Sequence, residues 1–222
     1  MIFKQDPGNY AQEFARKGYV LLKDILTPDF LSAMNAFHAR SKRGEAGEFG
    51  SGHVAGKKRQ YVFDFPGDAA ALEFRDGIAR LAGMRAEDIT ISERHLKQYD
   101  ESAQPWPAPH KDRHASTVSV GLPIDLGPET SVVVFPDYER SPNMEEKAVF
   151  MTADKPEELY ASKDALALHE ELGDMIVFLG STIFHERVKP AGTAVLYIKL
   201  NDKGWDPLGE DIYGAAKNTV AA

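Results

Sequence analysis

The second half of this 222-residue sequence is divided into short runs suited to β-strands, separated by residues that favour turns. The expected strands are residues 89–98, 116–124, 131–136, 147–151, 175–179 and 193–200. Proline and glycine mark the turns between them, at Pro105–Pro109, Gly127–Pro128, Pro136–Asp137 and Pro190–Gly192. Several short strands at this spacing favour a sandwich or a jelly roll over a chain of βαβ units.

The first third of the sequence is expected to be largely helical. A helix that contains residues 10–15 is expected to end at Gly18, because glycine readily adopts the left-handed conformation that closes a helix. Thr27-Pro28-Asp29 predicts the start of a second helix, with a hydroxyl cap, a proline in the first turn and an acid near the positive end of the dipole. A strand at 61–65 and a third helix at 68–82 follow. We therefore predict a mainly β protein with N-terminal helices.

The length suits a single domain that covers residues 1–222. Within it we expect helical support and a lid region at 10–85, a β core at 86–202 and a loosely held tail at 203–222. Residues 44–56 contain five glycines, and this loop is either a plain connection or a lid over a site.

Charge and composition exclude several classes of function. The formal net charge of −8 argues against nucleic acid or an anionic membrane as the main partner. The absence of cysteine excludes disulfides, zinc–thiolate sites and a thiol nucleophile. The first residues have no apolar run, so no signal peptide is expected, and no apolar stretch approaches the ~20 residues that would span a bilayer. These features predict a soluble protein of the cytoplasm.

His110 and Asp112, together with the distant His185, form the most informative set of polar residues. Residues two apart on an extended backbone point to the same face, so the first two side chains can reach one metal ion, whereas Lys111 points the other way. Two imidazoles and one carboxylate are the facial triad of non-haem iron(II) oxygenases, which leaves metal positions open for other ligands. A His-x-Asp pair alone is common by chance, so the flanking sequence matters.

Four segments resemble phytanoyl-CoA dioxygenase-like 2-oxoglutarate oxygenases, and they occur in the order found in that family. They are Glu13–Pro28, Lys97–Tyr99 with Trp106–Asp112, Glu129–Pro136, and Leu172–Leu179 leading to His185. The resemblance implies a double-stranded β-helix, the jelly roll also found in cupins. It further implies iron(II) held by His110, Asp112 and His185, with 2-oxoglutarate on the same iron, dioxygen as co-substrate and a small-molecule substrate. Related halogenases carry a small residue where this chain has Asp112, so the aspartate implies hydroxylation or desaturation.

The chain lacks one residue that is usual in this family. An arginine about ten residues beyond the distal histidine usually binds the far carboxylate of 2-oxoglutarate. Val195 and Leu196 occupy that region. The basic candidates are Arg187, Lys189 and Lys199, and strand alternation favours Lys199. An ammonium lacks the bidentate fork of arginine, and the alternative is that the lysine side chain extends to water. The expected contacts to the co-substrate are Lys199, Tyr197, Gln98 and Thr117.

Two other functions remain open on the sequence alone. A cupin-like metalloenzyme that does not use 2-oxoglutarate would be a co-substrate-free dioxygenase, an isomerase or a hydrolase. A non-catalytic jelly roll would bind a ligand without redox chemistry. In any metal site, Arg113 or Glu186 is expected to orient the imidazoles from behind.

Overall fold

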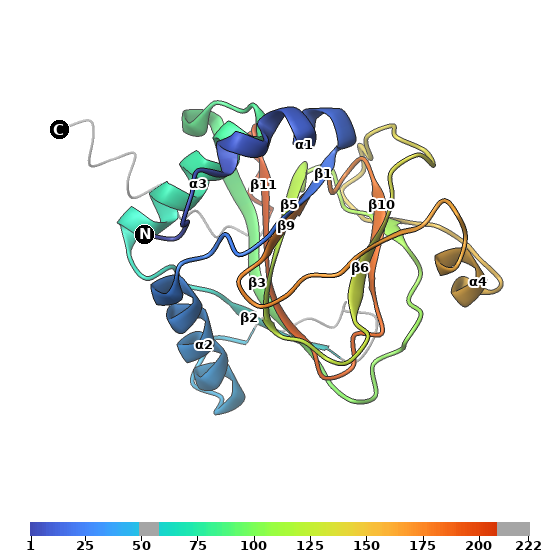
Figure 1. Cartoon of the computed structure of the whole chain (residues 1–222), viewed down its shortest axis with the longest axis horizontal. Helices are drawn as coiled ribbons and strands as arrows, with labels where there is room; N and C mark the ends of the chain where they lie inside the picture. Colours follow the sequence, from blue (N-terminus) through green and yellow to red (C-terminus); the bar gives the residue numbers. More distant parts are fainter. Residues whose placement is uncertain (49–57, 208–222) are drawn as a thin grey trace.

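Two antiparallel β-sheets face each other in the computed structural model, which describes residues 1–48 and 58–207 (Figure 1). The larger sheet has the strand order β1-β9-β5-β11-β3-β2, and the smaller sheet has the order β7-β4-β10-β6-β8. From β3 to β6, and again from β9 to β11, successive strands alternate between the two sheets. This alternation produces a double-stranded β-helix, so the predicted jelly roll with N-terminal helices is confirmed.

The strands of the larger sheet are β1 (Tyr19–Leu22), β2 (Lys58–Val62), β3 (Thr90–Tyr99), β5 (Val118–Asp125), β9 (Met175–Phe178) and β11 (Ala194–Asn201). Those of the smaller sheet are β4 (His110–Lys111), β6 (Ser131–Phe135), β7 (Val149–Phe150), β8 (Leu166–Leu168) and β10 (Phe184–Val188). The helices are α1 (Ala11–Lys17), α2 (Pro28–Lys42), α3 (Asp68–Ala82) and α4 (Pro156–Tyr160), with 3-10 turns η1 (Pro7–Tyr10) and η2 (Ala86–Asp88).

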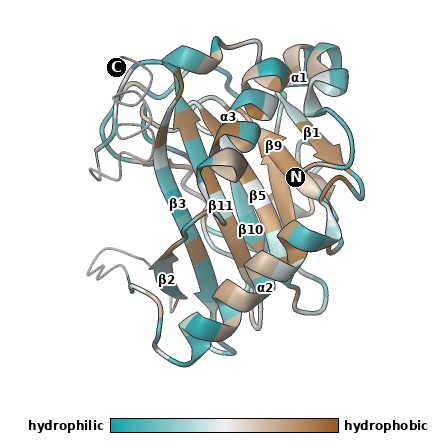
Figure 2. Cartoon of the chain, turned by 90° about the vertical axis from the view of Figure 1, so that its left-hand side faces the viewer, coloured by the Kyte–Doolittle hydropathy of each residue, from teal (hydrophilic) through white to brown (hydrophobic). Residues whose placement is uncertain are grey.

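Helices α1, α2 and α3 lie on the outer face of the larger sheet (Figure 2). Helix α2 begins as its sequence predicts, because the Thr27 hydroxyl accepts a hydrogen bond from the Phe30 amide. Helix α1 ends at Gly18, which has a φ of 79°. The outer-facing side chains of the sheet, among them Leu96 and Ile198, pack with Phe30 in the main apolar core. Burial of this core fixes the larger sheet as a rigid platform.

The inner face of the larger sheet is polar. Glu93, Lys97, Tyr197 and Lys199 alternate with the core residues of β3 and β11, so they face the space between the two sheets. Charged groups in such a space require partners or a ligand. The site described below lies on this face.

The element boundaries differ from the predictions in a few places. The strand expected at 61–65 is β2 at Lys58–Val62, whereas β4, β8, β10 and α4 have no clear apolar signal in the sequence. Residues 49–57 of the expected lid loop and residues 208–222 of the expected tail lie outside the described residues. No helix in the described part of the chain has the length and apolarity required to cross a membrane.

Candidate metal centre

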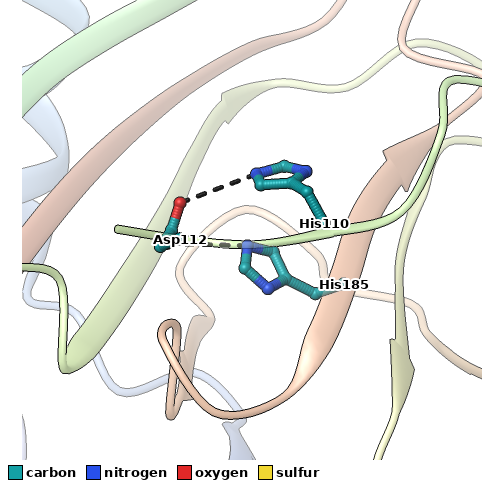
Figure 3. Close-up of side chains that lie close together, drawn as sticks. All are labelled: His110, Asp112 and His185. Atoms are coloured by element: carbon teal, nitrogen blue, oxygen red, sulfur yellow. Dashed lines mark ion pairs between the residues drawn. The ribbon is translucent and has the colours of Figure 1, made fainter. Parts of the chain in front are cut away.

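The structure brings His110, Asp112 and His185 together at one end of the space between the sheets. Strands β4 and β10 are neighbours, and His110 lies directly opposite His185 in their register. One potential ligand atom of each of the three residues lies within 4.8 Å of the others. Figure 3 shows both imidazoles directed toward the Asp112 carboxylate.

Each imidazole has its Nδ1 atom engaged and its Nε2 atom directed at Asp112. The Nδ1 of His185 lies 2.9 Å from the Ile183 carbonyl oxygen. The Nδ1 of His110 lies 2.9 Å from a Glu186 carboxylate oxygen. Both Nε2 atoms lie 3.6 Å from an oxygen of Asp112, one on each side of the carboxylate. Because a hydrogen on Nδ1 leaves the lone pair on Nε2, both histidines are set to bind a metal through Nε2.

The Asp112 carboxylate is buried and is supported by the larger sheet. The Ser119 hydroxyl on β5 donates a 2.7 Å hydrogen bond to Oδ2, and the Lys199 ammonium on β11 lies 2.6 Å from Oδ1. The backbone is fixed as well, because the Asp112 amide donates to the Gly180 carbonyl and the Asn143 side chain donates to the Asp112 carbonyl. These contacts hold the carboxylate in the polar space between the sheets.

The pKa values of the three groups follow from burial and from the neighbouring charges. Burial opposes ionisation of Asp112, but the Lys199 charge, together with the contacts to the two histidines, outweighs it and keeps the pKa of Asp112 well below the ordinary value. Burial is also the main influence on His185 and lowers its pKa to about 4, so this imidazole is neutral. Burial opposes the charged form of His110 too, but Glu186 and Asp112 raise its pKa to about 9. A metal at this site therefore displaces a proton from His110.

The donor set fits a divalent transition metal. Two imidazole nitrogens and one carboxylate oxygen, on one side of the ion, match the ligands of non-haem iron and leave the opposite positions open. The contacts to Glu186 and to the Ile183 carbonyl are the outer partners that orient such imidazoles. Glu186 therefore takes the orienting position expected from the sequence, whereas Arg113 donates to the Ser92 carbonyl.

A cavity opens to solvent beside the three residues. Its remaining lining is mixed, with cations, tyrosines and apolar side chains. Those residues are Lys97, Tyr99, Ser119, Val132, Phe178, Glu186, Arg187, Tyr197 and Lys199. The cations and hydroxyl groups of this lining are suited to contacts with an organic anion.

The four residues expected to bind the co-substrate are not all in this cavity. Lys199 and Tyr197 line it. Gln98 points to the opposite face of the sheet, where its amide donates a 2.5 Å hydrogen bond to Ser41 of α2. Thr117 is not among the cavity-lining residues in the part of the chain that the structure describes. Its backbone carbonyl accepts a hydrogen bond from the Gly180 amide.

Arg187 is a buried cation that lines the cavity. Strand alternation alone ranks it below Lys199 as a contact for the co-substrate. The Arg187 side chain is 1% exposed, donates a 2.8 Å hydrogen bond from Nε to the Tyr197 hydroxyl, and is paired with the buried Glu170 carboxylate. The sequence signal for it is its position two residues after His185 on the same strand, which places both side chains on one face.

Comparisons with known proteins agree with the fold. No protein-family model matches the sequence, and no curated protein matches it either. Solved structures do match. The non-haem alpha-ketoglutarate-dependent epimerase SnoN from nogalamycin biosynthesis has a TM-score of 0.62 and 16% identity, over 91% of this chain and 84% of SnoN.

Two further solved structures show the same likeness. A Pseudomonas putida prolyl-4-hydroxylase has a TM-score of 0.57 and 17% identity, over 88% of this chain and 98% of the hydroxylase. HygX from Streptomyces hygroscopicus, solved with nickel, 2-oxoglutarate and hygromycin B, has a TM-score of 0.56 and 12% identity, over 89% and 88% of the two chains. At these identities the likeness establishes the jelly-roll fold and nothing finer.

Proposed function

We propose that this protein is an iron(II)- and 2-oxoglutarate-dependent oxygenase that acts on a small molecule. The observation that carries the proposal is the convergence of two Nε2 atoms and one carboxylate on a cavity lined with cations. The fold is shared with alpha-ketoglutarate-dependent enzymes such as SnoN. When bound, iron(II) and 2-oxoglutarate supply an oxidant from dioxygen as the keto acid is converted to succinate and carbon dioxide.

His110, Asp112 and His185 hold the metal in this proposal. Glu186 and the Ile183 carbonyl keep the two imidazoles turned so that Nε2 faces the metal. Ser119 fixes the carboxylate through Oδ2. The protein thus contributes a fixed set of ligands and, beside them, a cavity in which the organic ligands can be placed.

Arg187 and Tyr197 are the proposed contacts for the far carboxylate of 2-oxoglutarate. Arg187 lies two residues beyond His185 on the same face of β10, which corresponds to about 7 Å along a strand. This distance suits a five-carbon dicarboxylate that also reaches the metal. The Lys97 ammonium, 5.2 Å from the centre of the Tyr197 ring, adds positive charge where Glu170 already neutralises Arg187. Lys199 is less suited because it contacts Asp112.

The finer assignments rest on the sequence. The resemblance to phytanoyl-CoA dioxygenase-like enzymes and the aspartate at position 112 favour hydroxylation or desaturation. SnoN and SnoK are named as an epimerase and a carbocyclase, and they illustrate that this fold supports other oxidative outcomes. The net charge of −8 favours a small molecule over nucleic acid.

A second candidate is a metalloenzyme of the same fold that does not use 2-oxoglutarate. It is favoured by one observation, the pairing of Arg187 with Glu170, because a guanidinium that is already neutralised attracts a dicarboxylate less strongly.

Succinate formation and oxygen consumption by the iron(II)-loaded protein test the proposal, with 2-oxoglutarate as the only substrate and ascorbate as the reductant that supplies the two electrons left over in each turnover. We expect slow, metal-dependent formation of succinate that His185→Ala abolishes. His169→Ala is the matched control, since His169 is exposed and lies outside the site, and it is expected to retain the activity. Absence of succinate from the metal-loaded wild type, together with no binding of 2-oxoglutarate, would contradict the proposal.

A further inference from the structure

Three charged side chains on the inner face of the larger sheet and the Asp112 carboxylate form a row of alternating charge. The Lys199 ammonium lies 2.6 Å from Asp112 Oδ1 and 3.6 Å from Glu93 Oε2. The other Glu93 oxygen lies 2.8 Å from the Lys97 ammonium. The side chains of Lys199, Glu93 and Lys97 are only 11–13% exposed, so these charges act on one another with little screening by water.

Strand register places Lys199 between Glu93 and Ser119. Lys199 lies opposite Glu93 on β3 and opposite Ser119 on β5. The hydroxyl of Ser119 and the ammonium of Lys199 are therefore neighbours, and each contacts a different oxygen of Asp112. The carboxylate that would bind a metal is thus already bound to a fixed positive charge.

A metal ion at Asp112 and the Lys199 ammonium would have to share one carboxylate. Two positive charges on the same small group repel each other, and the repulsion is strong where water is largely excluded. Glu93 offsets part of the lysine charge but lies farther from it than Asp112 does. Lys199 therefore opposes the metal through charge while it positions Asp112 through contact.

We infer that Lys199 is a positioning residue that keeps the affinity for a divalent metal low until an anionic ligand joins the metal. An anion on the metal offsets the positive charges of both the metal and the ammonium. Metal and anion should consequently bind with positive coupling, and by thermodynamic linkage each strengthens the other by the same factor. The role in metal binding stands on the geometry alone, whereas the choice of 2-oxoglutarate as the anion rests on the proposed function.

Calorimetric titration of Mn(II) into the wild type and Lys199→Met, with and without 2-oxoglutarate, tests this inference. Without 2-oxoglutarate, we expect Lys199→Met to bind Mn(II) about tenfold more tightly than the wild type or more. Addition of 2-oxoglutarate should then strengthen Mn(II) binding less in this variant than in the wild type. Lys199→Arg keeps the charge and should behave like the wild type in both titrations.

Lys97→Met is the matched control for the titration of metal alone. Lys97 is also a lysine of the inner face, and its ammonium lies 2.8 Å from Glu93 Oε1, whereas the Lys199 ammonium lies 2.6 Å from Asp112 Oδ1. We expect the Mn(II) affinity of Lys97→Met to change by less than about threefold. The charge that it removes is paired with Glu93, whereas the charge of Lys199 is paired directly with Asp112. An equal gain in affinity for Lys97→Met and Lys199→Met would overturn the specific role of Lys199, because net charge alone would then explain both.

Other outcomes separate this inference from the proposed function. If Lys199→Met binds Mn(II) no more tightly than the wild type, the role of Lys199 is overturned, even where 2-oxoglutarate still strengthens metal binding. If 2-oxoglutarate changes the Mn(II) affinity of no variant, the proposed function is contradicted, while tighter binding by Lys199→Met still supports the opposing charge. Should Lys199→Met fail to fold, the double variant Lys199→Met/Glu93→Gln compared with Glu93→Gln carries the same test.

Discussion

Gly180 lies directly against the Asp112 carboxylate. A Cβ atom added at Gly180 would be 2.7 Å from Asp112 Oδ2 and 2.9 Å from the Ser116 carbonyl oxygen. The backbone of Gly180 also accepts a 2.8 Å hydrogen bond from the Asp112 amide. The loop between β9 and β10 can approach the metal-ligand segment this closely only because position 180 has no side chain.

Gly180→Ala is therefore expected to displace the Asp112 carboxylate. We predict a loss of about 1–3 kcal/mol in the free energy of unfolding, as for other overpacked sites, and a clear loss of metal affinity. Gly47→Ala is the control, since a Cβ at Gly47 would meet nothing within 4 Å. Chemical denaturation and Mn(II) titration measure both effects. Equal metal affinity in the Gly180→Ala variant and the wild type would show that the carboxylate is not confined in this way.

The hydrogen bond from Ser119 to Asp112 gives a second prediction. Ser119→Ala leaves a buried carboxylate oxygen without its 2.7 Å donor. We expect the metal affinity to fall about 10–100-fold, as is typical when an outer partner of a metal ligand is lost. Ser102→Ala, at an exposed turn, should leave metal binding unchanged. A calorimetric titration in which Ser119→Ala matches the wild type would remove Ser119 from the account of the site.

The buried pair of Arg187 and Glu170 gives a third prediction. Arg187→Met leaves the Glu170 carboxylate buried without its partner, and we expect this to cost about 3–5 kcal/mol of stability. The double variant Arg187→Met/Glu170→Met should recover most of that loss, because both charges are removed together. Urea denaturation of the two single variants and the double variant measures the coupling, and additive losses would contradict it.

The same double variant tests the proposed contact to 2-oxoglutarate. We expect it to bind Mn(II) through the three ligands but to lose at least about tenfold in affinity for 2-oxoglutarate, because one charge-assisted contact is removed. Titration of 2-oxoglutarate into the Mn(II)-loaded variant measures this. Unchanged affinity would exclude Arg187 as the contact and would leave Lys199 and Lys97, the other two cations that line the cavity, as candidates for that role.

Local signals predicted much of the fold. The hydroxyl of Thr27 begins α2 through a short-range hydrogen bond, and Gly18 ends α1 through its left-handed backbone conformation. Both signals can be seen directly in the sequence. The apolar runs of β5, β6 and β9 were equally clear. Strand β10 was less clear, because His185, Glu186 and Arg187 interrupt its apolar pattern. The polar residues that conceal the strand are those that form the site.

Contacts between the sheets could not be predicted in the same way. Strand alternation places Lys199 on the inner face with Tyr197, but its partner Asp112 lies 87 positions away, just after strand β4 of the other sheet. Gln98 illustrates the same limit. Gln98 is next to the inner-facing Lys97 on β3, so its side chain points to the outer face. The hydrogen bond that it donates to Ser41 depends on how α2 packs on that face. The three candidate metal ligands can be identified from the sequence only because their residue types are distinctive.

Anaerobic titration of 2-oxoglutarate into the iron(II)-loaded protein tests the central claim most directly. If the keto acid chelates iron held by His110, Asp112 and His185, a weak visible charge-transfer band should grow and saturate. The band should be absent without iron and absent in the Asp112→Ala variant. Binding of 2-oxoglutarate that gives no such band, or that is equally strong without metal, would contradict an iron(II)/2-oxoglutarate centre in this protein.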